Sequence, residues 1–214
     1  MAVDPTLAFP HQHSLAEEIT NAVSHGVGLL MSIAASVLLL LHSDSGHVLL
    51  GCSLFSLSLV FLYTMSTLYH AFPSGKTRAV FQYLDHVAIF ILIAGSYSAY
   101  CMVAFYETFG IWMSCTVWAI ALLGILVQLF GGSWAHHVSQ VLYLVMGWLV
   151  ISQFSTVYAV LSPASFWLLL AGGLAYTVGF VFYALQRFPW MHAVWHFFVL
   201  GGSVCHVLSV LWAM

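Results

Sequence analysis

The stretch 48–70, VLLGCSLFSLSLVFLYTMSTLYH, decides the fold of this chain. It contains no Asp, Glu, Lys or Arg, and it is long enough to cross the hydrocarbon core of a bilayer as an α-helix, which takes about 20 residues. Six further apolar runs of this kind fill most of the sequence: 19–41, 80–102, 111–131, 139–160, 165–186 and 192–213. A β-barrel strand would instead alternate polar and apolar residues over about 10 positions. The sequence therefore predicts an all-α membrane protein, a bundle of seven transmembrane helices.

The composition excludes the other broad classes. Of 214 residues, 63% are hydrophobic and 4% are charged, whereas an ordinary soluble domain carries about 25% charged residues. Intrinsic disorder requires low hydrophobicity. A net charge of −3 provides no basic surface for nucleic acid, so no nucleic-acid partner is expected. The domain plan is a polar N-terminal arm, residues 1–18, and a transmembrane domain, residues 19–214; the five prolines fall outside the predicted spans.

The cations predict the orientation. Lys76 and Arg78 lie between the second and third runs, and Arg187 lies between the sixth and seventh. With an odd number of spans, both connections lie on the same side as the N-terminus. The positive-inside rule then predicts a cytoplasmic N-terminus and a C-terminus outside.

Ionisable residues inside predicted spans are costly and suggest function, and four of them share one end of the predicted bundle. His70 ends the second run, Asp85 lies near the start of the third, and His192 and His196 open the seventh. The predicted topology brings all four to the cytoplasmic ends of their helices, at a similar shallow depth. A common site is therefore possible.

The spacing of these residues fits a metal site. His192 and His196 are four residues apart and share one helix face, and Ser66 precedes His70 by the same interval. Three histidines leave the fourth position of a tetrahedral Zn²⁺ open for water. The HxxxH pair lacks the internal glutamate of an HExxH helix, so Asp85 is the candidate for holding or deprotonating that water.

Simpler readings exist for each of these histidines and for the acid. An HxxxH pair can arise by chance in a chain with 12 histidines, and Asp85 could be a buried structural acid or a proton-relay group. His86 points about 100° away from Asp85 on an ideal helix and is predicted to be structural. His206 is predicted to be structural as well. His25 is open between a structural role and a place behind the metal ligands.

Five stretches of the sequence resemble the hemolysin III family, the bacterial branch of the progestin and adipoQ receptor (PAQR) superfamily. They are EEITNAVSHG at 17–26, STLYH at 66–70, LDH at 84–86, PWMHAVWH at 189–196 and LGGSVCH at 200–206. The resemblance implies a zinc ion held near the cytoplasmic face by His70, His192 and His196. It also implies that Asp85 contacts the metal through water and that Ser66 lies beside the site. The resemblance implies that the protein is a multi-pass protein of the bacterial inner (plasma) membrane.

The wider superfamily includes alkaline ceramidases, so the resemblance implies a zinc-dependent, ceramidase-like hydrolase of a lipid amide or ester, with a role in membrane lipid homeostasis. In that reading Asp85 is the general base, Ser66 steadies Asp85 or the oxyanion, and membrane lipids are the partners. Two alternatives stay open: a non-enzymatic membrane sensor or regulator with a structural zinc, and a hemolysin-like pore or transporter. A retinal-type protein is excluded, because a Schiff base needs a lysine in the membrane and the only lysine, Lys76, lies in a connection. The lipid and the oligomeric state are left open.

Overall fold

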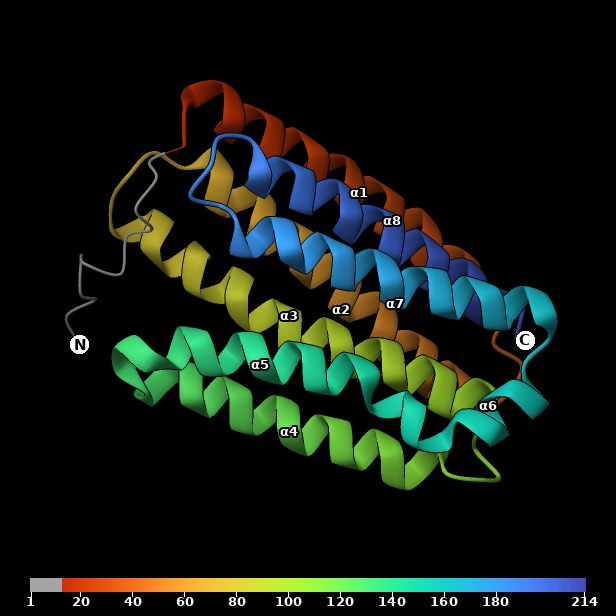
Figure 1. Ribbon diagram of the computed structural model, residues 1–214. Helices are drawn as coiled ribbons and strands as arrows, with labels where there is room; N and C mark the ends of the chain where they lie inside the picture. The colour runs from red at the N-terminus through yellow and green to blue at the C-terminus, as the bar shows by residue number, and fades with distance from the viewer. Residues whose placement is uncertain (1–12) are drawn as a thin grey trace.

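The structure is a computed structural model that describes residues 13–214. Within this range the chain forms helices and no strand, and seven helical segments are long and apolar enough to cross a membrane. They are α1 (Leu15–Leu41), α2 (Gly46–Ala71), α3 (Lys76–Val103), α4 (Gly110–Phe130), the composite segment Gly132–Val160, α7 (Pro163–Ala184) and α8 (Met191–Leu211). Figure 1 shows them lying side by side as an elongated bundle. The predicted fold class and the number of spans are confirmed.

Most ends of the spans differ by a few residues from the sequence prediction; α3, for example, begins at Lys76 instead of 80. The first helix begins at Leu15, within the predicted arm, whose residues 1–12 and two prolines lie outside the described part of the chain. The fifth span begins earlier than predicted, at Gly132 instead of 139, because a short 3₁₀ turn precedes its helix. Pro163 belongs to α7 as its first residue, a position where a helix has no use for the missing N–H.

The first helix is polar on its buried face and apolar on its exposed face. Its buried side is made of Glu17, Asn21, Ser24, His25, Gly28, Ser32 and Leu39. Its most exposed large side chains include Leu15, Ile19, Val23, Val27 and Leu30. Both sets recur at helical spacing, because the hydrophobic face is solvated by lipid while the polar face finds partners inside the bundle.

Close backbone packing draws α1 into the bundle. A Cβ added to Gly28 would lie 2.6 Å from the ring of Tyr63 on α2 and 2.7 Å from Leu200 on α8. Only glycine leaves room for both neighbours, so α1 fits into the groove between α2 and α8.

The fifth span is broken in the middle. It consists of η2 (Gly132–Trp134), α5 (Ala135–Trp148), η3 (Leu149–Gln153) and α6 (Phe154–Val160). The hydroxyl of Tyr97 on α3 donates to the carbonyl of Gly147 at 3.3 Å and accepts from the N–H of Val150 at 2.9 Å. These contacts supply partners for backbone groups at the break, which bare lipid could not do.

One end of the bundle carries the start of α1, the α2–α3 connection and the α7–α8 connection (Figure 1). We call it the histidine end. The described cations Lys76, Arg78 and Arg187 lie there, whereas Asp44 and Glu107 lie in connections at the opposite end. The predicted grouping of the charges is therefore present in the fold.

Candidate metal centre and its cavity

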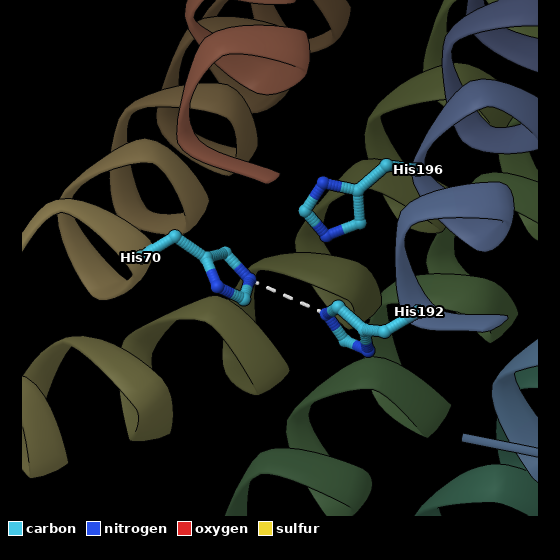
Figure 2. Close-up of side chains that lie close together, drawn as sticks. All are labelled: His70, His192 and His196. Atoms are coloured by element: carbon cyan, nitrogen blue, oxygen red, sulfur yellow. Dashed lines mark hydrogen bonds between the residues drawn. The ribbon is translucent and has the colours of Figure 1, made fainter. Parts of the chain in front are cut away.

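Three histidines from two helices meet at the histidine end. His70 lies in the last turn of α2, and His192 and His196 lie in the first two turns of α8. All three are buried, with 3%, 7% and 1% of their surface exposed. Each offers one ring nitrogen to a common point, and these three nitrogens lie within 4.8 Å of one another (Figure 2). The structure thus brings together the three residues predicted to hold a metal.

One pair of ring nitrogens has the separation of two ligands of a tetrahedral metal ion. Nε2 of His70 lies 3.3 Å from Nε2 of His192. Two nitrogens that each lie about 2.0–2.1 Å from a tetrahedral zinc are separated by about 3.3 Å. The ring centroids also form a nearly equilateral triangle, with sides of 5.1, 5.0 and 4.8 Å. The donor set and its geometry therefore fit a metal ion that prefers imidazole ligands.

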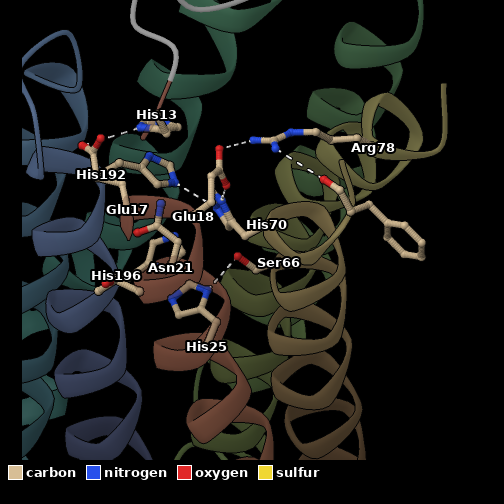
Figure 3. A network of polar contacts seen from close by, with 12 residues as sticks. His13, Glu17, Glu18, Asn21, His25, Ser66, His70, Arg78, His192 and His196 are labelled. Carbon is tan, nitrogen blue, oxygen red and sulfur yellow. Dashed lines mark hydrogen bonds and ion pairs between the residues drawn. The ribbon is translucent and has the colours of Figure 1, made fainter. Parts of the chain in front are cut away.

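The outward nitrogens of two of these histidines bind residues of α1, and Figure 3 shows the contact of His70 with Glu18. Nδ1 of His70 lies 2.7 Å from Oε2 of Glu18, and the other oxygen of that carboxylate pairs with Arg78. Nδ1 of His196 lies 3.2 Å from the hydroxyl of Ser24. Metal-binding histidines commonly donate their second N–H to such groups, which fixes the orientation of the ring.

Glu17, next to Glu18, secures the start of both α1 and α8. Its backbone N–H and side chain form a capping box with Ser14, and its Oε1 accepts the N–H of Trp190 at 2.6 Å. Trp190 has a φ of 68°, in the left-handed region, immediately before α8 begins. The hydrogen bond from Glu17 stabilises this strained turn and so helps to place His192.

Ser66 and Asp85, the predicted catalytic pair, lie beside the three histidines. The hydroxyl of Ser66 is 2.7 Å from Nδ1 of His25, and Asp85 on α3 interacts with the same serine. The ring of His25 in turn stacks on His196, with centroids 3.6 Å apart. A polar chain therefore runs from α1 through α2 to α3 at the edge of the metal centre.

A cavity of about 130 Å³ extends from this centre into the bundle. Asp85, Ser66 and the histidines of α8 line one part of it, and Gly147, Gly173 and Phe180 belong to its apolar walls. Its lining reaches His206, ten residues beyond His196 and thus about 15 Å along α8. The site therefore opens into a mainly apolar space inside the bundle.

The comparisons with known proteins place the chain in a family. Residues 13–207 match the family model described as "Haemolysin-III related". The chain belongs to the hemolysin III family. It is 40% identical to a hemolysin-3 homolog of Bacillus subtilis over 201 residues, which cover 92% of this chain and 94% of the relative. It is 36% identical to hemolysin-3 of Bacillus cereus over 198 residues, covering 91% and 90%.

A more distant relative is the human monocyte to macrophage differentiation factor, 25% identical over 203 residues, or 91% of this chain and 83% of the relative. No solved structure matches the chain significantly. The family and the seven apolar helices identify a multi-pass membrane protein of the bacterial hemolysin III and PAQR type.

The sequence indicates some residues around the three histidines but not the contacts that they make. The sequence alone does not show that Glu18 and Ser24 contact His70 and His196, because the partners lie far apart in the chain. His25, left open, lies against His196 and Ser66. His86 contacts Tyr183 at 3.3 Å and the carbonyl of Gln82 at 2.6 Å and is no member of the histidine triad among the described residues.

Proposed function

We propose that this hemolysin III protein is a zinc-dependent hydrolase of a membrane lipid amide or ester, with its site in the cytoplasmic leaflet of the bacterial inner membrane. The observation that carries the proposal is the triad of buried histidines, two of which, His192 and His196, line a largely apolar cavity. A zinc with three protein ligands keeps one position for water or substrate, whereas structural zinc sites are usually closed by four ligands. The expected setting is membrane lipid homeostasis, and the partners are membrane lipids.

Each residue of the site has a separate role in the proposed hydrolysis. His70, His192 and His196 would hold the zinc, which supplies polarisation of a scissile carbonyl and activation of water. As water attacks the carbonyl carbon, Asp85 accepts its proton and passes it to the leaving amine or alcohol when the carbon–nitrogen or carbon–oxygen bond breaks. Ser66, which interacts with Asp85, steadies that carboxylate. The apolar cavity receives the acyl chain.

The test is release of fatty acid by the full-length protein in zinc-containing proteoliposomes. A ceramide and a phospholipid serve as amide and ester probes, and free fatty acid is measured by mass spectrometry. Wild type should release fatty acid from one of them, and His196→Ala should not. If wild type with bound zinc releases none from either probe, the hydrolase proposal fails for these lipids and a regulatory role gains ground.

A regulatory protein with a structural metal is the second candidate. The observation in its favour is that the triad joins the last turn of α2 to the first turns of α8, so that an ion would clamp two helices together. In that case zinc should raise the unfolding temperature of the protein without any turnover of lipid.

A further inference from the structure

We propose that Glu18 is a positioning residue of the metal centre: its carboxylate fixes His70 in the tautomer that turns the lone pair of Nε2 toward the metal. This inference rests on the proposed function only in its assumption that the triad binds zinc. It assigns to α1, a helix that supplies none of the three histidines, control over how well they bind.

The hydrogen-bond geometry defines the tautomer. An ionised carboxylate can only accept hydrogen bonds, so Nδ1 of His70, 2.7 Å from Oε2 of Glu18, must carry the proton. In a neutral imidazole the lone pair then lies on Nε2. That nitrogen faces Nε2 of His192 at 3.3 Å, where the metal would lie. The opposite tautomer would place an N–H where a ligand atom is needed.

Arg78 holds the carboxylate in this role. Its guanidinium pairs with Oε1 of Glu18 and lies over the ring of Tyr69, with 4.9 Å from the guanidinium carbon to the ring centroid. The two oxygens of Glu18 therefore have different partners: Oε1 binds Arg78 and Oε2 binds His70. A charged partner also favours the ionised form of the acid, which is the form that can only accept.

A second histidine of the triad, His196, also has a hydrogen-bond partner on α1. The hydroxyl of Ser24 donates to the carbonyl of Asn21 at 3.0 Å, so its oxygen is left to accept the Nδ1–H of His196. His192 differs, because its buried Nδ1 has no hydrogen-bond partner among residues 13–214. Of the two α1 partners, Glu18 and Ser24, only Glu18 is charged, so its loss should have the larger effect on zinc binding.

The test is the zinc dissociation constant of the full-length protein in detergent, measured by competition with a chromophoric chelator. Glu18→Gln should weaken binding by about 10–100-fold, the usual effect of removing such a partner, while zinc still binds at saturating concentration. The matched control is Glu107→Gln, which changes an exposed carboxylate in the α3–α4 connection and should leave the constant unchanged. Wild-type affinity in Glu18→Gln would overturn the proposal.

A double variant separates positioning from a merely structural ion pair. In Glu18→Gln the amide oxygen would face Arg78, so the NH₂ group would face Nδ1 of His70 and favour the wrong tautomer. Adding Arg78→Gln frees the amide to turn, and zinc affinity should partly recover. A structural ion pair predicts instead no recovery or a further loss, and that result would overturn the proposal. If wild type itself binds no zinc, the proposed function fails together with this inference.

Discussion

The most buried helix of the histidine site and one wall of its cavity are buried to very different degrees. Within the part of the chain that the structure describes, α3 is 67% buried over its most apolar window, whereas the broken fifth span Gly132–Val160 is 17% buried. The candidate metal-binding and catalytic side chains come from α2, α3 and α8, with α1 packed behind them. The fifth span contributes cavity wall, including Gly147 and Trp148. In the proposed function, the packed half, made of α1, α2, α3 and α8, would carry the chemistry, and the fifth span would border the space for the lipid.

The largest effect should come from Asp85→Asn. Loss of the candidate base should lower kcat by about 10²–10⁴-fold, because general base catalysis contributes that much to such reactions. Zinc content should stay at the wild-type value, since Asp85 is not a member of the triad. Fatty-acid release and zinc content are measured on the same preparation, with Asp44→Asn at the opposite end as the control. Full activity in Asp85→Asn would remove this residue as the base.

A large side chain at Gly28 should disturb the packed half. Leucine there would clash with Tyr63 and Leu200, and overpacking of this kind costs about 1–3 kcal/mol of the free energy of unfolding. Gly201→Leu is the matched control, because a Cβ added at Gly201 meets nothing within 4 Å. Both are compared by unfolding in mixed detergent micelles. Equal stability of the two variants would contradict the close packing of α1 against α2 and α8.

A bulky side chain in the cavity wall should affect substrate more than fold. Gly147 belongs to the cavity lining, and a Cβ added there meets nothing within 4 Å, so Gly147→Phe can fold and places a bulky ring at the edge of the cavity. KM should rise about tenfold, which corresponds to about 1.4 kcal/mol, with zinc content unchanged. Gly201→Phe, on α8 and absent from the cavity lining, provides the comparison. An equal KM for both variants would argue against the cavity as the lipid site.

The smallest effect should come from a single hydroxyl in the packed half. Tyr63 donates to the hydroxyl of Ser203 at 2.8 Å, joining α2 to α8 below the site. Tyr63→Phe keeps the ring beside Gly28 and removes this bond together with a longer contact from the same hydroxyl to the carbonyl of Val199 at 3.5 Å. We expect a loss of about 0.6 kcal/mol, typical of helix-to-helix hydrogen bonds in membranes. The same unfolding assay checks this value. A loss several times larger would show that the tyrosine supports the metal end through the hydroxyl.

The fold could be predicted from sequence because lipid imposes a simple rule: runs such as 48–70 must be helices of spanning length. The break in the fifth span could not be predicted, because its backbone groups find their partner in Tyr97, which is far away in the sequence. Local pattern also does not show that η2 extends that span back to Gly132.

The triad could be predicted because topology brings the end of α2 and the start of α8 to one face, while the four-residue interval keeps His192 and His196 on one side. The outer partners could not. Glu18 finds His70 across 52 positions of sequence, and no spacing rule links them. The buried polar stripe of α1 carries the signal, since a carboxylate on a buried face must have a partner.

The central claim, that His70, His192 and His196 hold zinc, is tested most directly by elemental mass spectrometry of protein purified in detergent without chelator. The account predicts about one zinc ion per chain in wild type and loss of zinc in each of the three alanine variants. His137→Ala, which removes an exposed histidine outside the triad, should keep its zinc. Wild-type protein without zinc, or zinc that persists in all three variants, would contradict the account.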